Sequence, residues 1–225
     1  MKKRIESHYP VDQEMLEAFS SLKDVMSVSC VVSDAQEREN VMASFMKMRT
    51  TDRPFIGTAL TVKLTTGMLV DPLQVLELAH KGDVVVIDAA GETETSIWGG
   101  LMSGLARAAG IVGVVIDGAA RDIDESRMLE FPIVSRAVTP RGAQSAYTKL
   151  YDPIEINTEI TCGGVVVRPG DMVVADEIGV TVVPRDNLSE TFEKARRLSE
   201  QEEKTRAEIL KGATFQELLE KFGRI

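Results

Sequence analysis

Apolar and polar residues follow two different periods in the first part of the chain. Apolar residues recur every three to four positions over 12–22 and 34–48, which predicts two helices. Asp12 and Asp34 stand where N-cap residues are expected for these helices. Residues 55–64 alternate apolar and polar side chains, which is typical of a strand.

The middle of the chain repeats a helix followed by a strand. The pattern predicts helices over 71–83 and 98–109, each followed by an apolar strand, at 84–88 and 112–116. Gly110 is suited to end the second of these helices. Strands that alternate with helices in this way form a parallel sheet whose two faces are covered.

The remaining sequence has a different residue pattern. Residues 133–138 and 154–183 are rich in β-branched residues and turn dipeptides, which predicts short strands that are partly antiparallel. Residues 187–222 are amphipathic and strongly charged, with opposite charges at helical spacing. We therefore predict a single α/β domain over 1–225, of which 187–225 form a helical C-terminal extension.

Composition narrows the range of functions. The 225 residues include 44% hydrophobic residues and carry a net charge of −9, which disfavours non-specific binding to nucleic acid. No apolar stretch approaches the roughly 20 residues that span a bilayer, and no apolar segment follows the basic N-terminus, so we expect a cytoplasmic protein without a membrane partner. Cys30 and Cys162 are expected to be small buried side chains. The only histidines, His8 and His80, are too few to suggest a His-rich zinc site or a Ser-His-Asp triad.

The candidate chemistry begins with the pair Arg121–Asp122. The pair follows the predicted strand at 112–116, with Asp117-Gly118 expected to form the turn that ends the strand. Ligands bind at the carboxyl ends of strands in open α/β sheets. There Arg can grip a carboxylate with two hydrogen bonds, and Asp can hold a hard cation. The alternative is an exposed ion pair without a ligand.

A second candidate element is Gly99-Gly100, at the expected start of a helix. Backbone N–H groups there suit a carboxylate or phosphate, although the glycines could instead serve close packing between helix and strand. The spacing does not match the dinucleotide-binding pattern G-x-G-x-x-G, so NAD is not expected. Neighbouring parallel strands would bring the Gly99–Met102 amides, Arg121 and Asp122 around one crevice. Together with Mg²⁺ or Mn²⁺, such a crevice suits cleavage of a C–C bond next to a keto group.

Four segments resemble a known family. They are WGGLMSGLARAAGIVGVVIDGAARD (98–122), GTALTV (57–62), KGDVVVIDAAG (81–91) and CGGVVVRPGDMVVADEIGVTVVP (162–184). They are similar, in this order, to the regulator of ribonuclease activity A family. This family includes the class II pyruvate aldolases, with 4-hydroxy-4-methyl-2-oxoglutarate aldolase as the type. The resemblance spans roughly residues 33–210.

The resemblance implies a layered αββα core with parallel and mixed sheets, of the swivelling β/β/α kind. It also implies a homotrimer or hexamer with active sites between subunits. Arg121 falls on the residue that binds the substrate's carboxylate and keto oxygens, and Asp122 on the ligand to Mg²⁺ or Mn²⁺. The backbone of Gly99, Gly100, Leu101 and Met102 falls on the segment that contacts the pyruvate carboxylate. Glu202 falls on a carboxylate that reaches the metal-bound water of a neighbouring subunit, with Glu200 and Glu203 as rivals.

One position departs from the family pattern. The aldolases usually carry Asp or Glu where this chain has Gly100; Glu92 or Glu94 could replace that acid. The resemblance implies a divalent-metal-dependent lyase that cleaves a 2-oxo acid to pyruvate, or decarboxylates oxaloacetate. A non-catalytic protein that binds and regulates a ribonuclease is the alternative, and the presence of Asp122 argues against it. The change at Gly100 also leaves room for an enzyme acting on another carbonyl substrate.

Overall fold

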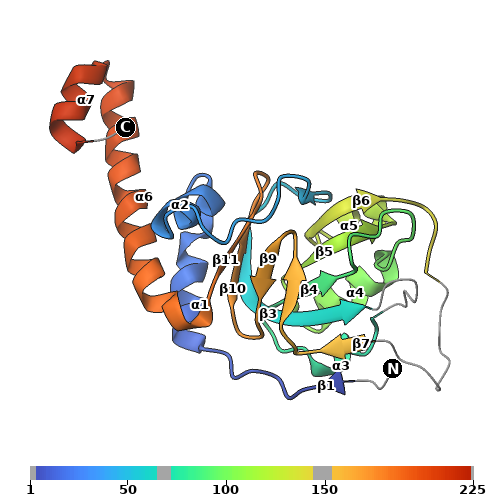
Figure 1. The fold of residues 1–225 in the computed structure, drawn as a ribbon. Coiled ribbons are helices and arrows are strands. Elements are labelled where there is room, and N and C mark those ends of the chain that lie inside the picture. The colour runs from blue at the N-terminus through green and yellow to red at the C-terminus, as the bar shows by residue number, and fades with distance from the viewer. Residues whose placement is uncertain (1–3, 65–71, 144–153, 224–225) are drawn as a thin grey trace.

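The structure is a computed structural model that describes residues 4–64, 72–143 and 154–223. A mixed sheet in the order β1-β7-β3-β4-β5-β6-β2 dominates it, and β10 and β11 join this sheet through β3 (Figure 1). The strands of this sheet are β1 Arg4–Ile5, β2 Lys47–Met48, β3 Phe55–Leu64, β4 Asp83–Asp88, β5 Gly113–Ala120, β6 Ile133–Val138, β7 Ile154–Ile156, β10 Met172–Ala175 and β11 Val180–Val183. A separate hairpin consists of β8 Ile160–Cys162 and β9 Val165–Val167.

The helices flank these strands. They are α1 Gln13–Ser20, α2 Val28–Ala35, α3 Val75–Leu78, α4 Gly100–Ala108, α5 Ile123–Met128, α6 Leu188–Leu210 and α7 Phe215–Phe222, with short 3₁₀ turns at Ser21–Asp24 and Arg185–Asn187. The pairs β3–β4, β4–β5 and β5–β6 are parallel, as the helix–strand repeat predicts. By contrast, β10 runs antiparallel to both β3 and β11.

Three hydrophobic clusters separate four layers. Alternate residues of β4 face opposite sides: Val85 and Ile87 pack with Trp98 and Met102 near α4. On the other side, β4 residues pack against β8–β11. The far face of β10 and β11 packs against α1, α2 and α6. The layers are therefore α, β, β and α, which confirms the predicted αββα core.

Two helix predictions need correction. The helix predicted over 34–48 is wrong, because α2 occupies Val28–Ala35 and Asp34 lies in its last turn rather than at an N-cap. Left-handed backbone at Glu37, Arg38 and Asn40 then excludes a helix. Apolar residues of this loop pack beneath the sheet, so their helical spacing reflects burial rather than a helix. Asp12, in contrast, is confirmed as an N-cap, because its side chain accepts a hydrogen bond from the Met15 N–H at 3.0 Å.

The helix predicted over 71–83 is also shorter than expected. Residue 71 lies outside the described residues, and the helix within the rest is the single turn of α3, followed by extended backbone at Ala79. Asp117-Gly118 is not the turn that ends a strand. Instead β5 continues through it to Ala120, with a register shift after Ile116. The shifted backbone places the Asp117 carboxylate 2.8 Å from the Gly163 N–H.

Of the two cysteines predicted to be buried, one is buried and one is exposed. Cys162 is buried, and burial raises the pKa of its thiol well above the usual range. Cys30 is exposed, because it lies on the outward side of α2. The prediction that Cys30 is buried is therefore wrong.

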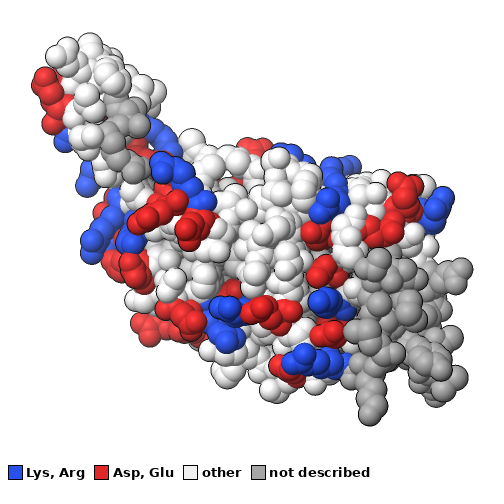
Figure 2. Space-filling view, in the orientation of Figure 1, with Lys and Arg blue, Asp and Glu red and all other residues white. Residues whose placement is uncertain are grey.

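The C-terminal extension is helical as predicted, in two pieces. Helix α6 packs on α1 and α2 through Leu188, Thr191, Ala195 and Ser199, and its second half extends beyond the sheet layers (Figure 1). A capping box at Thr214 starts α7. Acidic and basic side chains alternate along α6 in Figure 2, and ion pairs such as Arg206–Glu202 join successive turns. Among the described helices, none is long and apolar enough to cross a membrane.

Candidate functional site

The end of β5 and the start of α4 form one structural unit. The Arg121 N–H donates to the Trp98 carbonyl at 2.9 Å, and the Ile97 N–H donates to the Ala119 carbonyl at 3.1 Å. Asp122 follows in the left-handed conformation, with φ of 52°, and occupies the N-cap position of α5 without a capping hydrogen bond from its side chain. This conformation is uncommon outside glycine, though Asp and Asn tolerate it best. The turn therefore directs Arg121 and Asp122 to the carboxyl edge of the parallel strands, beside the N-terminus of α4.

The residues that were predicted to surround a crevice lie together. Asp122 Oδ2 accepts a hydrogen bond from the Gly100 N–H at 3.2 Å and lies 3.6 Å from Arg121 Nε. The side chains of Arg121 and Asp122 are 44% and 45% exposed, so a ligand can reach both. In the rest of the predicted binding segment Gly99–Met102, Leu101 is 80% exposed and Met102 is buried in the core. A negatively charged or oxygen-rich ligand therefore meets a guanidinium, a carboxylate and a helix N-terminus in one place.

Three glycines make room for these side chains. A Cβ on Gly99 would lie 2.6 Å from Asp122 Oδ2. A Cβ on Gly100 would overlap the carboxylate of Glu125, and one on Gly142 would overlap the Arg121 guanidinium. Gly99 and Gly100 therefore leave space for the side chains of Asp122 and Glu125 at the start of the helix, rather than serving packing between helix and strand alone.

A buried hydroxyl network fixes the two helices that carry the site. Trp98 Nε1 donates to Ser103 Oγ at 3.0 Å, and Ser103 Oγ is 2.8 Å from Ser126 Oγ. The ring of Trp98 also stacks on Phe131, with centroids 6.2 Å apart. These contacts join α4 to α5 and hold Asp122 and Glu125 against the start of α4.

Glu125 and Gly142 were not identified from the sequence. Glu125 had a local signal, since it stands three residues after Asp122 at the start of a helix, where both side chains share a face. Gly142 had none, because its place beside Arg121 depends on an isolated bridge between Ser96 and Gly142. Their proximity to the site is a consequence of tertiary structure.

Glu92 and Glu202, the other candidate acids, form contacts of their own. Glu92 accepts a hydrogen bond from the Glu94 N–H at 2.7 Å, which closes its own turn. Glu202 forms an ion pair with Arg206 at 2.6 Å on α6, across the sheet layers from α4 (Figure 1). Within one chain Glu202 does not approach Asp122, so its predicted role concerns a neighbouring subunit.

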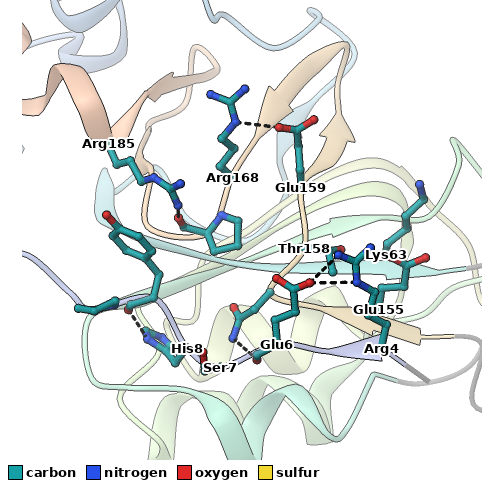
Figure 3. A pocket seen from close by; sticks show the side chains of 14 residues that line it. Arg4, Glu6, Ser7, His8, Lys63, Glu155, Thr158, Glu159, Arg168 and Arg185 are labelled. Atoms are coloured by element: carbon teal, nitrogen blue, oxygen red, sulfur yellow. Dashed lines mark hydrogen bonds and ion pairs between the residues drawn. The ribbon is translucent and has the colours of Figure 1, made fainter. Parts of the chain in front are cut away.

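A cavity of about 790 Å³ lies away from this site, between the N-terminal segment and β3, β7 and the loop before β10 (Figure 3). Its lining residues are Arg4, Glu6, Ser7, His8, Tyr9, Pro10, Lys63, Glu155, Asn157, Thr158, Glu159, Arg168, Pro169 and Arg185. Some of the charged side chains that line the cavity pair with one another, such as Arg168 with Glu159 at 2.7 Å. Its lining includes neither Arg121 nor Asp122, so this cavity is not part of the candidate site around these two residues.

Two known proteins are similar to this chain in sequence. A protein of Halalkalibacterium halodurans named "Putative 4-hydroxy-4-methyl-2-oxoglutarate aldolase" is 38% identical over 166 residues, covering 74% of this chain and 77% of that protein. A Deinococcus radiodurans protein of the same name is 34% identical over 154 residues, covering 68% of this chain and 91% of that protein.

A solved structure extends the similarity to the whole fold. Streptomyces coelicolor RraAS2, described as an unusual member of the RNase ES inhibitor RraA protein family, aligns with a TM-score of 0.74 at 26% identity. The alignment covers 88% of this chain and all of that one. The model of the RraA-like family, described as aldolase/RraA, matches residues 29–182, more than half of the chain. The chain belongs to the RraA-like family.

Proposed function

We propose that this protein is a divalent-metal-dependent lyase that cleaves a C–C bond of a 2-oxo acid to release pyruvate, or decarboxylates oxaloacetate. The convergence of Arg121 and Asp122 on the N-terminus of α4 is the observation that carries the proposal. Relatives named as aldolases support the same class of reaction.

Each residue of the crevice has a role in this reaction. Arg121 binds the substrate carboxylate with two parallel hydrogen bonds, and N–H groups in the first turn of α4 contribute further donors. Asp122 fits a hard cation such as Mg²⁺ or Mn²⁺, because its carboxylate is half exposed in a space that a side chain on Gly99 would fill. The bound ion would polarise the keto group and stabilise the charge that develops when the C–C bond breaks.

Glu125 supplies the acid that the family pattern leads one to expect at position 100. Its carboxylate lies where a side chain on Gly100 would begin. From α5 it therefore reaches the same part of the crevice that an Asp or Glu on α4 would reach. We assign to Glu125 the role of holding and delivering a proton on its carboxylate oxygen.

Exposed apolar side chains beside the crevice support an oligomer with shared sites. Leu101, Leu105 and Met128 on α4 and α5 are 80%, 54% and 86% exposed, and a neighbouring subunit would bury them. The outer part of the C-terminal extension also exposes Leu210 and Phe215. A trimer or hexamer in which this extension brings Glu202 to a neighbouring crevice accounts for both surfaces.

Metal removal tests the proposal directly. We expect pyruvate release from oxaloacetate or 4-hydroxy-4-methyl-2-oxoglutarate in a coupled lactate dehydrogenase assay, complete loss with EDTA, and recovery with Mg²⁺ or Mn²⁺. Asp122 is the expected oxygen ligand, and both ions accept oxygen ligands. Turnover that survives EDTA would exclude the metal-dependent mechanism, and no release from any 2-oxo acid would exclude the lyase.

Gly142→Ala tests whether Arg121 must keep its observed position. The new Cβ overlaps the guanidinium, so we expect Arg121 to move and KM for the oxo acid to rise several-fold while the fold is retained. Gly179→Ala is a matched control, because a Cβ there meets open space and neither glycine has a positive φ. Equal KM values for Gly142→Ala and the wild type would show that Arg121 does not need this position.

The regulatory alternative has a specific observation in its favour. RraAS2, whose structure is similar, is described as belonging to an RNase ES inhibitor family. The net charge of −9 also suits a basic protein partner. A pull-down with purified ribonuclease tests this alternative, because recovery of no ribonuclease would exclude it. Ribonuclease binding that persists in an Asp122→Asn variant would not depend on the proposed lyase site.

A further inference from the structure

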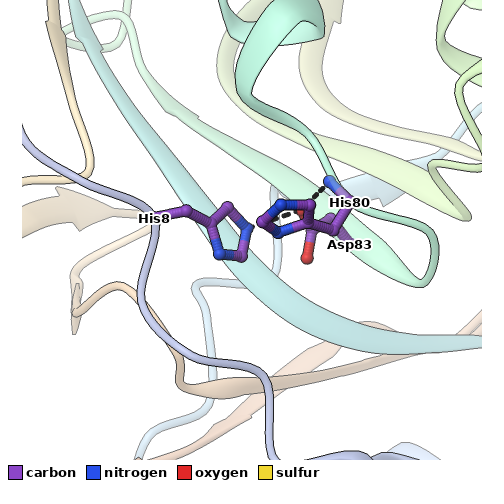
Figure 4. A group of neighbouring side chains, drawn as sticks. All are labelled: His8, His80 and Asp83. Atoms are coloured by element: carbon purple, nitrogen blue, oxygen red, sulfur yellow. Dashed lines mark hydrogen bonds and ion pairs between the residues drawn. The ribbon is translucent and has the colours of Figure 1, made fainter.

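Both histidines of the chain lie together at the other edge of the sheet. His8 precedes α1, His80 lies in the turn before β4, and Asp83 is the first residue of β4 (Figure 4). One potential ligand atom from each lies within 4.8 Å of the other two. The two imidazole rings meet edge to face, with centroids 4.0 Å apart. Residues 72 positions apart in the sequence thus form one cluster.

Asp83 is the centre of this cluster and is fully buried. Its Oδ2 lies 2.8 Å from His8 Nε2 and accepts a hydrogen bond from the His80 N–H at 2.7 Å. Its Oδ1 is buried without a hydrogen-bond partner. An unpartnered oxygen of a buried carboxylate is costly, and a bound cation is one of the few groups that can satisfy it.

The imidazole of His8 is already oriented for coordination. Its Nδ1 lies 2.6 Å from the Tyr9 carbonyl, which can only accept a hydrogen bond, so Nδ1 carries the proton. In the neutral ring this leaves the lone pair of Nε2 directed towards Asp83. A backbone carbonyl that fixes the tautomer of a histidine in this way is a common feature of metal sites.

We propose that His8, His80 and Asp83 form a binding site for a divalent transition metal, with Zn²⁺ as the expected ion. Two imidazoles and one carboxylate are a familiar Zn²⁺ donor set, with a fourth position open to water or another ligand. Ligand atoms about 2.1 Å from a tetrahedral ion stand roughly 3.4 Å apart. The ion therefore replaces the 2.8 Å contact between His8 and Asp83 rather than adding to it.

This site is separate from Asp122. Strands β4 and β5 are parallel, Asp83 begins β4, and Asp122 follows the end of β5, so the two carboxylates lie at opposite edges of the sheet. The ligand types also differ, since oxygen ligands alone suit Mg²⁺ and imidazole suits Zn²⁺. His8 lies outside residues 29–182, the part that matches the family model.

The consequence of metal binding is a fixed N-terminal segment. His8 lies in the segment that also lines the large cavity, together with Tyr9 and Pro10. A bond from His8 through the ion to Asp83 would tie this segment to the sheet and hold one wall of the cavity. Because the metal binds the folded protein, saturation would also raise the thermal unfolding midpoint.

Titration of the metal-free, full-length protein with Zn²⁺ and Co²⁺ tests the proposal. We expect one equivalent of Zn²⁺ at this site by calorimetry, and visible absorption of four-coordinate Co²⁺ at the same stoichiometry. Loss of a group that merely supports a ligand costs about 10–100-fold in affinity, so His80→Ala should cost at least that much. His80 is exposed, so this variant should fold, and His8→Ala should behave in the same way.

Asp122→Asn provides the matched control and should bind Zn²⁺ as the wild type does. This separates the site from the proposed lyase, because either one can fail without the other. If the protein binds no Zn²⁺, or if His80→Ala and His8→Ala bind it with unchanged affinity, the cluster is only a hydrogen-bonded pair of His8 and Asp83. Protection of the N-terminal segment from proteolysis by Zn²⁺ in the wild type, but not in His80→Ala, would establish the tether.

Discussion

Asp122→Asn is expected to abolish metal-dependent release of pyruvate while leaving the fold intact. Asparagine tolerates the left-handed backbone at φ of 52°, and its side-chain oxygen can still accept the Gly100 N–H. The variant loses the negative charge that would hold the cation. Metal polarisation of the keto group stabilises the transition state by several kcal/mol, so kcat/KM should fall by at least about a hundredfold.

Two measurements make this result specific. The affinity for Mn²⁺, measured by electron paramagnetic resonance, should fall together with the activity. Asp124→Asn, an exposed acid on the same helix, should change neither quantity. An Asp122→Asn variant with the wild-type rate at low metal concentration would remove Asp122 as the ligand.

The layers of the fold could be predicted because their signal is local. Apolar runs at 84–88 and 112–116 predicted buried parallel strands, and the structure pairs them in register as β4 and β5. The helix over 98–109 was confirmed within two residues as α4. In each case the side chains that make the pattern are those that the layers bury.

The errors arose where tertiary contacts override a local pattern. Met42 and Met46 have helical spacing, but they pack under the sheet from a loop with left-handed residues. Asp117-Gly118 has turn composition, yet the strand continues because Asp117 bonds to Gly163 and Arg136, far along the sequence. A pattern within a short window cannot represent such partners.

The candidate site likewise contains residues whose positions follow from the local pattern and residues whose positions depend on tertiary contacts. Arg121, Asp122 and Gly100 were predictable because they follow two strands that pair, and their close approach follows from that pairing. Glu125 could not be predicted as a neighbour of Gly100, because the two residues are 25 positions apart in the sequence. Its carboxylate comes from another helix, and only the packing of α4 on α5 brings it beside Gly100.

The second large loss of activity is expected when the Glu125 carboxylate on α5 is replaced. Glu125→Gln keeps the size of the side chain but removes its ability to deliver a proton. We expect kcat to fall by about 10²–10⁴-fold, the usual contribution of a positioned acid or base. The pH dependence of kcat should lose one limb, and the affinity for the metal should change little. An unchanged pH profile would assign Glu125 a structural role only.

A carboxylate on α4 should lower the activity of the wild type and raise the activity of a Glu125→Ala variant. Alone, Gly100→Asp places its Cβ on the Glu125 carboxylate, so one of the two acids must leave the crevice, and activity should fall. Combined with Glu125→Ala, the same Asp has free space and lies where the family pattern places its acid. We expect the double variant to regain at least about tenfold over Glu125→Ala, a modest part of what a well-positioned acid contributes. If Gly100→Asp instead raises activity in the wild type, Glu125 is not the proton donor, and the crevice lacks an acid that the substitution restores.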